Sequence, residues 1–213
     1  MREATSNRRW KQDPDGVKAN ILAVALEEFS CNGLSGARID EIAAKTATSK
    51  RMIYYYFGDK EGLYRRVLEQ AYAKVRRGEE DLLLDHLPPR EGLKQLVNFT
   101  FDHHSKTPDF IRLVMIENIH HGSYLKNSEV IRKLNKAAIS NVETLYRRGV
   151  ADGVFRQGIS PLAIHWQISA LTFFNVSNQI SFSLLFGDEL YTEAGQKKLR
   201  EQIAETVLRF VSI

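Results

Sequence analysis

The sequence lacks several features that mark common classes of protein. It has one cysteine, Cys31, in 213 residues, which excludes an internal disulfide and favours a reducing compartment. No apolar run at its start resembles a signal peptide. Its most apolar stretch, residues 162–186, carries ten polar residues among twenty-five and does not qualify as a membrane span. We therefore expect a cytoplasmic protein with no membrane partner.

Signatures of enzymes and metal centres are also missing. The chain has no Gly-rich phosphate loop, no Gly-x-Ser-x-Gly motif and no His-Glu-x-x-His motif. Its histidines include two adjacent pairs, at 103–104 and 120–121, but neighbours on a helix point about 100° apart and cannot chelate locally. We expect no enzymatic activity, no cofactor and no metal, and keep a metal-responsive protein as a less favoured alternative.

Charge of one sign is scarce too. The chain has 30 Lys and Arg against 26 Asp and Glu, for a net charge of +4. Residues 1–60 hold ten basic side chains against eight acidic ones. Any nucleic-acid surface must therefore come from the local placement of charge rather than from a strongly basic domain.

The most informative stretch is residues 38–63, where two short helical patterns flank a break at 46–49. Ile39 and Ile42 recur at helical spacing in the first pattern, as Ile53 and Phe57 do in the second. Ser49 stands where it can cap the second helix. Helices of this size and spacing are typical of a helix-turn-helix, whose second helix enters the DNA major groove.

A helical hairpin with a solvated charged face is the alternative for the same residues. The aromatic run at 54–57 argues against it, because four consecutive rings point to every side of a helix and cannot all be buried. Tyrosine hydroxyls are good phosphate donors, and phosphate contacts fix the register of a protein on DNA. We therefore favour DNA binding.

The first quarter of the chain resembles the DNA-binding domain of the TetR family of bacterial repressors. The resemblance rests on residues 25–29, 32–33, 42–44, 49–50, 54–57 and 60–61, which fall at the family's separations. Two positions depart from the pattern. Ala47 occupies a turn position that is usually glycine, and Met52 occupies a position that often holds a phosphate-binding threonine.

Together these patterns predict a DNA-contacting surface. We expect base-edge contacts from Thr48, Lys50 and Arg51, beside the capping residue Ser49. We expect the phosphate contacts to come from Arg38, Tyr54, Tyr55, Tyr56 and Lys60. The partner would be a double-stranded DNA operator.

The whole chain is predicted to be all-α, with an N-terminal three-helix helix-turn-helix domain and a larger helical domain for ligand binding and dimerisation. Pro and Gly positions delimit about nine helices, at 17–32, 39–46, 50–56, 60–86, 90–106, 109–121, 125–152, 161–186 and 195–212. We expect a flexible arm at 1–16, a DNA-binding domain at 17–64 and an effector-binding and dimerisation domain at 65–213. The basic cluster at 8–11 is interpreted as a solvated tail, with a minor-groove arm as the alternative.

The last two predicted helices carry more apolar surface than one interface needs. The helix at 161–186 is apolar on more than one face, which predicts burial on opposite sides. In the TetR family these two helices form a four-helix bundle with their mates, so the resemblance implies a homodimer. Burial inside one large monomer core is the alternative.

Residues 110–118 and 173–178 resemble a subset of TetR regulators, more weakly than the first domain does. That resemblance implies a pocket walled by the fifth to eighth helices. Such pockets are mainly apolar with a few placed polar groups. The candidate pocket residues are Phe101, His104, Met115, Asn118, Trp166, Phe173, Phe174 and Asn178. The expected effector is a small planar aromatic or heterocyclic metabolite.

These expectations combine into a homodimeric transcriptional repressor that a small-molecule effector releases from its operator. The fourth helix would be shared by both domains and could transmit rotation from one to the other. A helical DNA-binding accessory protein without an effector is the alternative, and only the pocket distinguishes the two.

Overall fold

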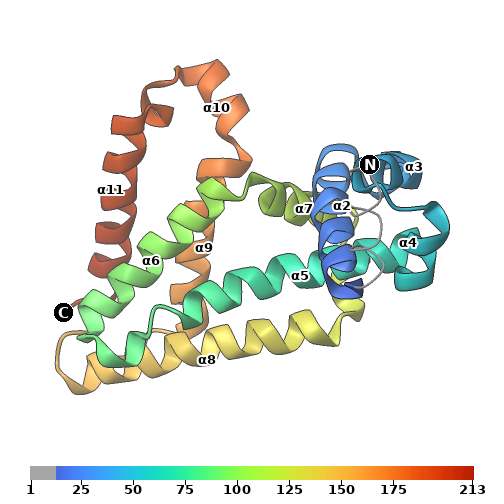
Figure 1. Cartoon of the computed structure of the whole chain (residues 1–213). Helices are drawn as coiled ribbons and strands as arrows, with labels where there is room; N and C mark the ends of the chain where they lie inside the picture. The colour runs from blue at the N-terminus through green and yellow to red at the C-terminus, as the bar shows by residue number, and fades with distance from the viewer. Residues whose placement is uncertain (1–12) are drawn as a thin grey trace, which may run out of the picture. The chain divides into compact units, whose positions relative to one another are not determined.

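The computed structural model describes residues 13–213, which form ten α-helices, three short 3₁₀ helices and no strand (Figure 1). A single antiparallel bridge pairs Phe155 with Ser212 in this part of the chain. The prediction of an all-α fold is confirmed. No helix within residues 13–213 is long and apolar enough to cross a membrane. The basic cluster at 8–11 and most of the predicted arm lie outside the described residues.

The chain divides into two compact units. Among the described residues, the first holds 13–71 together with Arg112–Ser128, and the second holds Tyr72–Ile111 and Glu129–Ile213. The predicted domains placed 112–128 with the C-terminal part, but these residues pack with the N-terminal helices instead. A split of this kind is invisible to a reading along the chain, because it depends on which surfaces meet after folding.

The first unit contains the helices of the predicted DNA-binding domain. They are α2 (Pro14–Gly36), α3 (Ile39–Thr46), α4 (Lys50–Phe57) and the first part of α5 (Lys60–Glu80), joined by most of α7 (Pro108–Ile119) and by η2 (Leu125–Asn127). The side chain of Asp13 accepts from the Gly16 amide and caps α2, so this helix begins before the expected residue 17. The core of the unit includes Ile21, Phe29, Ile42, Ile53, Leu63 and Tyr64, none of which is exposed.

The second unit is a bundle. It holds the end of α5, η1 (Leu84–His86), α6 (Pro89–Lys106), α8 (Glu129–Ala151), α9 (Pro161–Ser177), α10 (Gln179–Phe186), η3 (Glu189–Tyr191) and α11 (Glu193–Val211). α6 packs against α8, α9 and α11. The buried core of this bundle includes Leu93, Val97, Phe101, Val142, Leu145, Ile164, Ile168 and Val207.

Two predicted helices continue past a break in the structure, and a third, expected at 125–152, begins at Glu129 after η2 (Leu125–Asn127). The helix expected at 60–86 ends at Glu80, because Leu83 takes a left-handed backbone with φ +48° before η1 begins. The helix expected at 161–186 is two helices, α9 and α10, which meet at Asn178 with φ −108° and ψ 6°. Neither break coincides with a proline or glycine, so the sequence gives no local stop signal.

Candidate functional site

The turn between α3 and α4 has the geometry that the sequence predicts. Ala47 ends α3 in the left-handed conformation, with φ +50° and ψ 30°. The hydroxyl oxygen of Ser49 accepts from the Met52 amide at 3.2 Å and so caps α4. The two short helices are thereby held at a fixed angle by a turn that carries strain at one residue.

The outer face of α4 carries the predicted contact residues. Ile53 is the one residue of α4 that is fully buried, and it anchors the helix in the first unit. Arg51 is exposed, as are Tyr54 at 39% and Tyr55 at 78%. Tyr56 is half-buried, and the Lys18 ammonium lies 5.5 Å from the centre of its ring. A rigid helix therefore presents a cation and two phenols to solvent.

Lys50, a predicted base-contacting residue, is paired with an acid. Its Nζ lies 2.8 Å from Oδ1 of Asp40, and it donates a hydrogen bond to Oδ2 at 3.0 Å. This hydrogen bond and the charge of Asp40 raise the pKa of Lys50. Arg38 has a looser partner, with 3.8 Å between its guanidinium and Glu41. Both cations lie on the surface, and the Lys50 ammonium shares its donors with Asp40.

The start of α5 is already capped. Oδ1 of Asp59 accepts from the Gly62 amide at 2.6 Å, and a Cβ on Gly62 would lie 2.2 Å from the Phe57 carbonyl oxygen. Lys60 donates to the Ser35 carbonyl at 3.3 Å. Lys60 is thus placed by a contact to the end of α2, while the negative charge of Asp59 occupies the first turn of α5.

A buried acid that the sequence reading missed fixes the start of α3. Glu28 is 7% exposed, and its Oε1 accepts from the Arg38 amide and from the Asn32 side-chain amide, both at 3.1 Å. The signal was present, because Glu28 lies on the same stripe of α2 as the buried Ile21 and Ala25. A charged residue on an apolar stripe predicts a buried hydrogen-bonding role.

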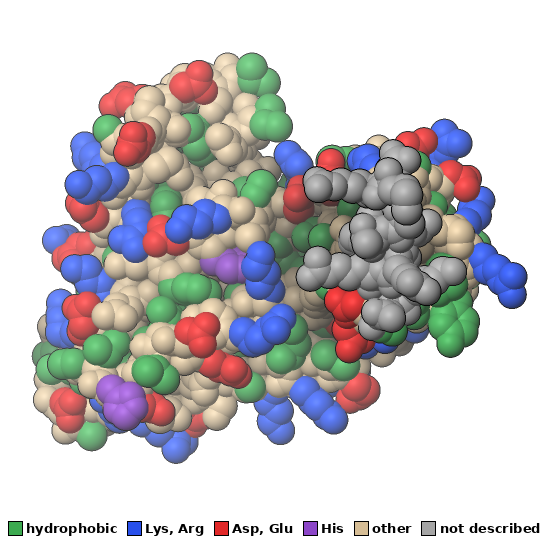
Figure 2. Space-filling view, in the orientation of Figure 1, with side chains coloured by type: hydrophobic (Ala, Val, Ile, Leu, Met, Phe, Trp, Pro, Cys, Tyr) green, Lys and Arg blue, Asp and Glu red, His purple; other side chains and the backbone are tan. Residues whose placement is uncertain are grey.

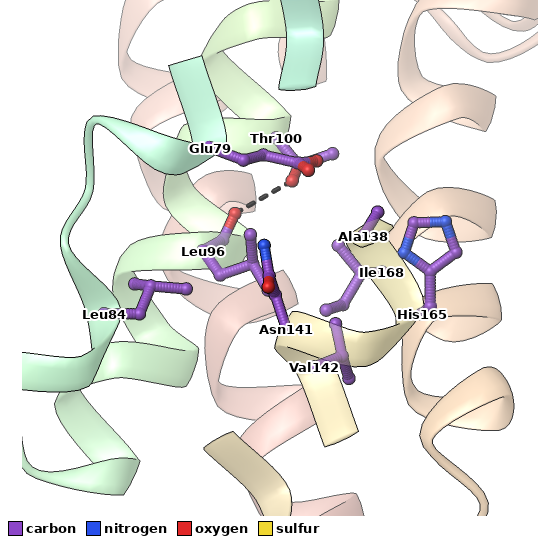
Figure 3. A pocket seen from close by; sticks show the side chains of 9 residues that line it. All are labelled: Glu79, Leu84, Leu96, Thr100, Ala138, Asn141, Val142, His165 and Ile168. Carbon is purple, nitrogen blue, oxygen red and sulfur yellow. Dashed lines mark hydrogen bonds between the residues drawn. The ribbon is translucent and has the colours of Figure 1, made fainter. Parts of the chain in front are cut away.

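The second unit encloses a small cavity between α5, η1, α6, α8 and α9 (Figure 3). Its volume is about 20 Å³, enough for about one water molecule. Polar side chains enter it from several helices, and apolar ones complete the wall. The lining residues are Glu79, Leu84, Leu96, Thr100, Ala138, Asn141, Val142, His165 and Ile168.

The predicted pocket residues are divided between the two units. Phe101, His104 and Phe173 belong to the second unit, and the His104 and Phe173 rings lie 6.5 Å apart. Met115, which is half-buried, and Asn118 belong to the first unit. Asn178 lies at the break between α9 and α10, where its amide donates to the Ser177 hydroxyl.

Three of these residues contradict the prediction of an interior wall. Asn118 is exposed, and its amide donates to the Val114 carbonyl of its own helix. Trp166 and Phe174 are 67% and 51% exposed on the outside of α9. An apolar pattern reports that a face avoids water, and it does not distinguish an internal wall from a surface that another chain covers. The cavity instead uses Glu79, Asn141 and His165, which we did not predict.

On the face that Figure 2 draws, Lys and Arg side chains alternate with Asp and Glu, in accord with the net charge of +4. Within residues 13–213, no three His, Cys, Asp or Glu side chains are grouped so that they could hold a metal ion.

Comparison with known proteins assigns both parts of the chain. Residues 21–67 match the model of bacterial regulatory proteins of the tetR family, and residues 89–207 match a tetracyclin repressor-like C-terminal domain. The HTH-type transcriptional repressor NicS of Pseudomonas putida is 33% identical over 198 residues, which cover 93% of each chain. An HTH-type transcriptional repressor of Streptomyces coelicolor is 28% identical over 201 residues, covering 94% of this chain and 97% of its own.

Solved structures give the same fold. A transcriptional regulator of Streptomyces coelicolor superposes with a TM-score of 0.69 at 22% identity, covering 92% of this chain and 98% of its own. The regulator FadR of Bacillus subtilis, solved in complex with stearoyl-CoA, has a TM-score of 0.67 at 17% identity, covering 89% and 97%. With two matching family models and a relative that is similar along nearly its whole length, this chain belongs to the TetR family of bacterial transcriptional regulators.

Proposed function

We propose that the protein is a homodimeric repressor that binds an operator through α4 and leaves it when a small organic molecule binds in the second unit. The observation that carries this proposal is the exposed face of α4. The helix is anchored by the buried side chain of Ile53 on its opposite face and is capped by Ser49. The relatives named as transcriptional repressors support the direction of regulation.

The proposed roles divide along α4 and its neighbours. Thr48, Lys50 and Arg51, beside Ser49, contact base edges, and a bidentate contact from Arg51 to guanine contributes ~1–3 kcal/mol of discrimination. Tyr54, Tyr55, Tyr56, Arg38 and Lys60 contact phosphates. Binding then weakens with salt, with a log–log slope near −0.9 for each phosphate neutralised.

A fluorescence anisotropy titration tests the DNA part. Purified protein is titrated against the DNA upstream of its own gene and against unrelated DNA of equal length. Arg51→Ala should lose the preference between the two DNAs and keep salt-sensitive non-specific binding. Arg147→Ala is the matched control, because Arg147 is an exposed arginine on α8 in the other unit. Intact discrimination in Arg51→Ala would remove Arg51 from the base-contacting set.

The homodimer is supported by apolar side chains that one chain leaves uncovered. Leu162, Trp166 and Phe174 lie along one face of α9 at multiples of four residues and are 61%, 67% and 51% exposed. The exposed residues of α10 extend this apolar surface, namely Ile180, Leu184, Leu185 and Phe186. Exposed apolar surface of this extent marks an interaction site, and two-fold homo-oligomers are the commonest assemblies.

Light scattering tests the assembly. Wild-type protein should have the mass of a dimer, and Trp166→Glu should shift it towards the monomer, because a carboxylate cannot be buried in an apolar interface without a partner. Val130→Glu, at a 44% exposed apolar residue of α8, is the control and should stay dimeric. A monomeric wild-type protein would exclude this part of the proposal.

α5 offers a route for coupling. Leu63 and Tyr64 of this helix lie in the core of the first unit, and Glu79 near its other end lines the cavity of the second. An effector that moves the end of α5 therefore acts on a helix that also supports α4. A coupling of ~1–3 kcal/mol would weaken operator affinity about 5- to 150-fold. An accessory protein without an effector would show no such response to any metabolite.

A further inference from the structure

Two adjacent histidines lie among aromatic rings inside the second unit. The rings of His103 and His104 on α6 are 6.2 Å apart, and their centres lie 6.0 and 6.1 Å from the ring of Phe110. Phe99 approaches His103 at 5.8 Å, and Phe173 approaches His104 at 6.5 Å. This setting is apolar and ring-lined, yet it contains two groups that need hydrogen-bond partners.

The protons of His103 can be placed from its neighbour. The hydroxyl of Thr107 donates its one hydrogen to the His103 carbonyl at 2.6 Å, so at 3.2 Å it can only accept from Nδ1 of the ring. The ring proton therefore lies on Nδ1. Nε2 keeps its lone pair, and this atom is buried without a partner.

His104 also has a buried ring nitrogen without a hydrogen-bond partner, but in this residue the atom is Nδ1. A hydrogen bond to the Thr172 backbone raises the pKa of His104, as expected when the imidazole donates to a carbonyl. Because Nδ1 of His104 has no partner, the donor in this bond is Nε2. Burial, followed by the charge of His103, lowers the pKa of His104 to about 4. The ring is thus neutral near pH 7, and Nδ1 is an acceptor in a side chain that is only 6% exposed.

His104 does not line the cavity but lies one helical turn beyond its wall. Thr100 lines it on α6 and Ile168 lines it on α9. His104 and Thr172 lie one helical turn further along the same faces of these two helices. A molecule that enlarges the cavity by displacing side chains along this line reaches the His104 ring.

Arg76, a largely buried cation whose charge acts on both histidines, is already paired. Arg76 donates through Nη1 to the carboxylate of Glu79 and through Nη2 to Oδ1 of Asn135 at 3.1 Å. Its Nε is buried and unpaired. The site therefore offers one free donor and two neutral acceptors. Its inner cation, Arg76, is already paired with Glu79, and Lys74, whose charge also acts on His103, lies on the surface. A carboxylate ligand would bring acceptors only and leave the histidine nitrogens unpaired.

We propose that the cavity extends to His104 and takes a small, planar, uncharged ring that has an N–H or O–H donor for Nδ1 of His104 and an acceptor for Nε of Arg76. Cyclic amides and hydroxylated heteroaromatic rings have this pairing of groups. The inference rests on the proposed function, since it names the chemical class of the effector. The orphan nitrogen of His104 is the observation that selects a donor over an anion.

Nuclear magnetic resonance of the histidine ring nitrogens in the full-length protein tests the site. The probes are 2-pyridone, which has the donor and acceptor side by side, N-methyl-2-pyridone, which lacks the donor, and benzoate, which is an anion of similar size. We expect 2-pyridone to bind at low-millimolar concentration and to shift the Nδ1 resonance of His104. A buried acceptor left unpaired costs ~1–3 kcal/mol, so N-methyl-2-pyridone should bind about tenfold more weakly or worse.

Variants separate the histidine from its surroundings. His104→Phe keeps a ring of similar shape without the acceptor and should lose 2-pyridone binding, and His104→Gln keeps an acceptor oxygen and should retain part of it. His120→Phe, at an exposed histidine of the first unit, is the control. Equal binding of the N-methylated probe, preference for benzoate, or no binding by any probe would each overturn the proposal, and these results need no variant.

Operator release is read separately by anisotropy. A shift at His104 without operator release would leave the site standing and remove the effector role. Release of the operator by a metabolite in the His104→Phe variant, with unchanged potency, would preserve the regulatory function and exclude this site.

Discussion

Tyr64 on α5 donates its phenolic hydrogen to Oε1 of Glu117 on α7, across 3.0 Å. The two side chains are 0% and 1% exposed. Oε2 of Glu117 accepts from the amides of Tyr124 and Leu125, each at 3.1 Å. One buried carboxylate therefore holds α7 and the following turn against the helix that leads from the DNA-binding helices.

Removal of the Tyr64 hydroxyl should weaken the first unit. Tyr64→Phe keeps the ring packed against Phe29 and Tyr124 but leaves Glu117 with one partner fewer. A buried acceptor that loses a hydrogen bond costs ~1–3 kcal/mol in the free energy of unfolding. Urea denaturation measures the change. Tyr54→Phe, on the exposed face of α4, should leave the stability as it was; equal losses in both variants would contradict the role assigned to Glu117.

Glycine at position 47 should stabilise the helix-turn-helix. The left-handed backbone of Ala47 costs ~1–2 kcal/mol because the residue has a Cβ, and glycine removes this cost. Glycine also makes the unfolded chain more flexible, which lowers the stability of the folded state by ~0.5–1 kcal/mol. Ala47→Gly should therefore raise the free energy of unfolding by about 1 kcal/mol. In Ala44→Gly, the same replacement inside α3 should cost ~1 kcal/mol. Thermal denaturation of both variants checks the opposite signs.

Asp40 should restrain DNA binding through Lys50. Asp40→Asn removes the charge that pairs with Lys50 at 2.8 Å and frees the ammonium for DNA. The pair is exposed to solvent, so its effect is small, and operator affinity should rise by a few-fold at most and only at low salt. Anisotropy titrations measure it, with Asp152→Asn in the second unit as the control. Unchanged or weaker binding in Asp40→Asn would mean that Lys50 makes no contact with DNA.

Acid should destabilise the protein through its buried histidines. Burial lowers the pKa of His103, His104 and His165 to about 4, below the value of about 6.5 in an unfolded chain. Between pH 6.5 and pH 4 the unfolded chain binds more protons than the folded chain does. The contribution of these histidines to the free energy of unfolding is therefore complete above pH 6.5 and is lost as the pH falls towards 4. The slope from each group is at most about 1.4 kcal/mol per pH unit.

Urea denaturation between pH 7.5 and pH 5 measures this slope, and His104→Phe should make it shallower. Glu79 opposes the trend, because burial raises its pKa and protonation then favours the folded state. A free energy of unfolding that is constant over this range would show that these histidines titrate alike in both states.

The sequence predicts best where local signals and packing agree. The helix at 39–46 and the cap at Ser49 follow from apolar spacing and a capping hydroxyl, and both are found as expected. The break at Asn178 was missed because a helix can end through packing of its flanks without proline or glycine. The pairing of Lys50 with Asp40 joins residues ten apart on different helices, which no periodicity reveals.

The predicted pocket shows most clearly where prediction from the sequence stops. His104 was expected among the pocket residues, and its burial and unpaired Nδ1 now give a physical reason to keep it there. Trp166 was expected for the same compositional reason and is instead 67% exposed. Burial is a property of whole surfaces, so residue type alone does not separate these two outcomes.

The discontinuity of the first unit constrains how regulators of this kind can be recombined. A crossover within α5 that exchanges everything up to Ala71 leaves behind residues 112–128, which complete the same core. A chimaera would then place Tyr64 from one parent opposite Glu117, or its replacement, from the other. Engineered or natural exchanges of the first unit should therefore succeed most often when the segment up to Ala71 and residues 112–128 are exchanged together.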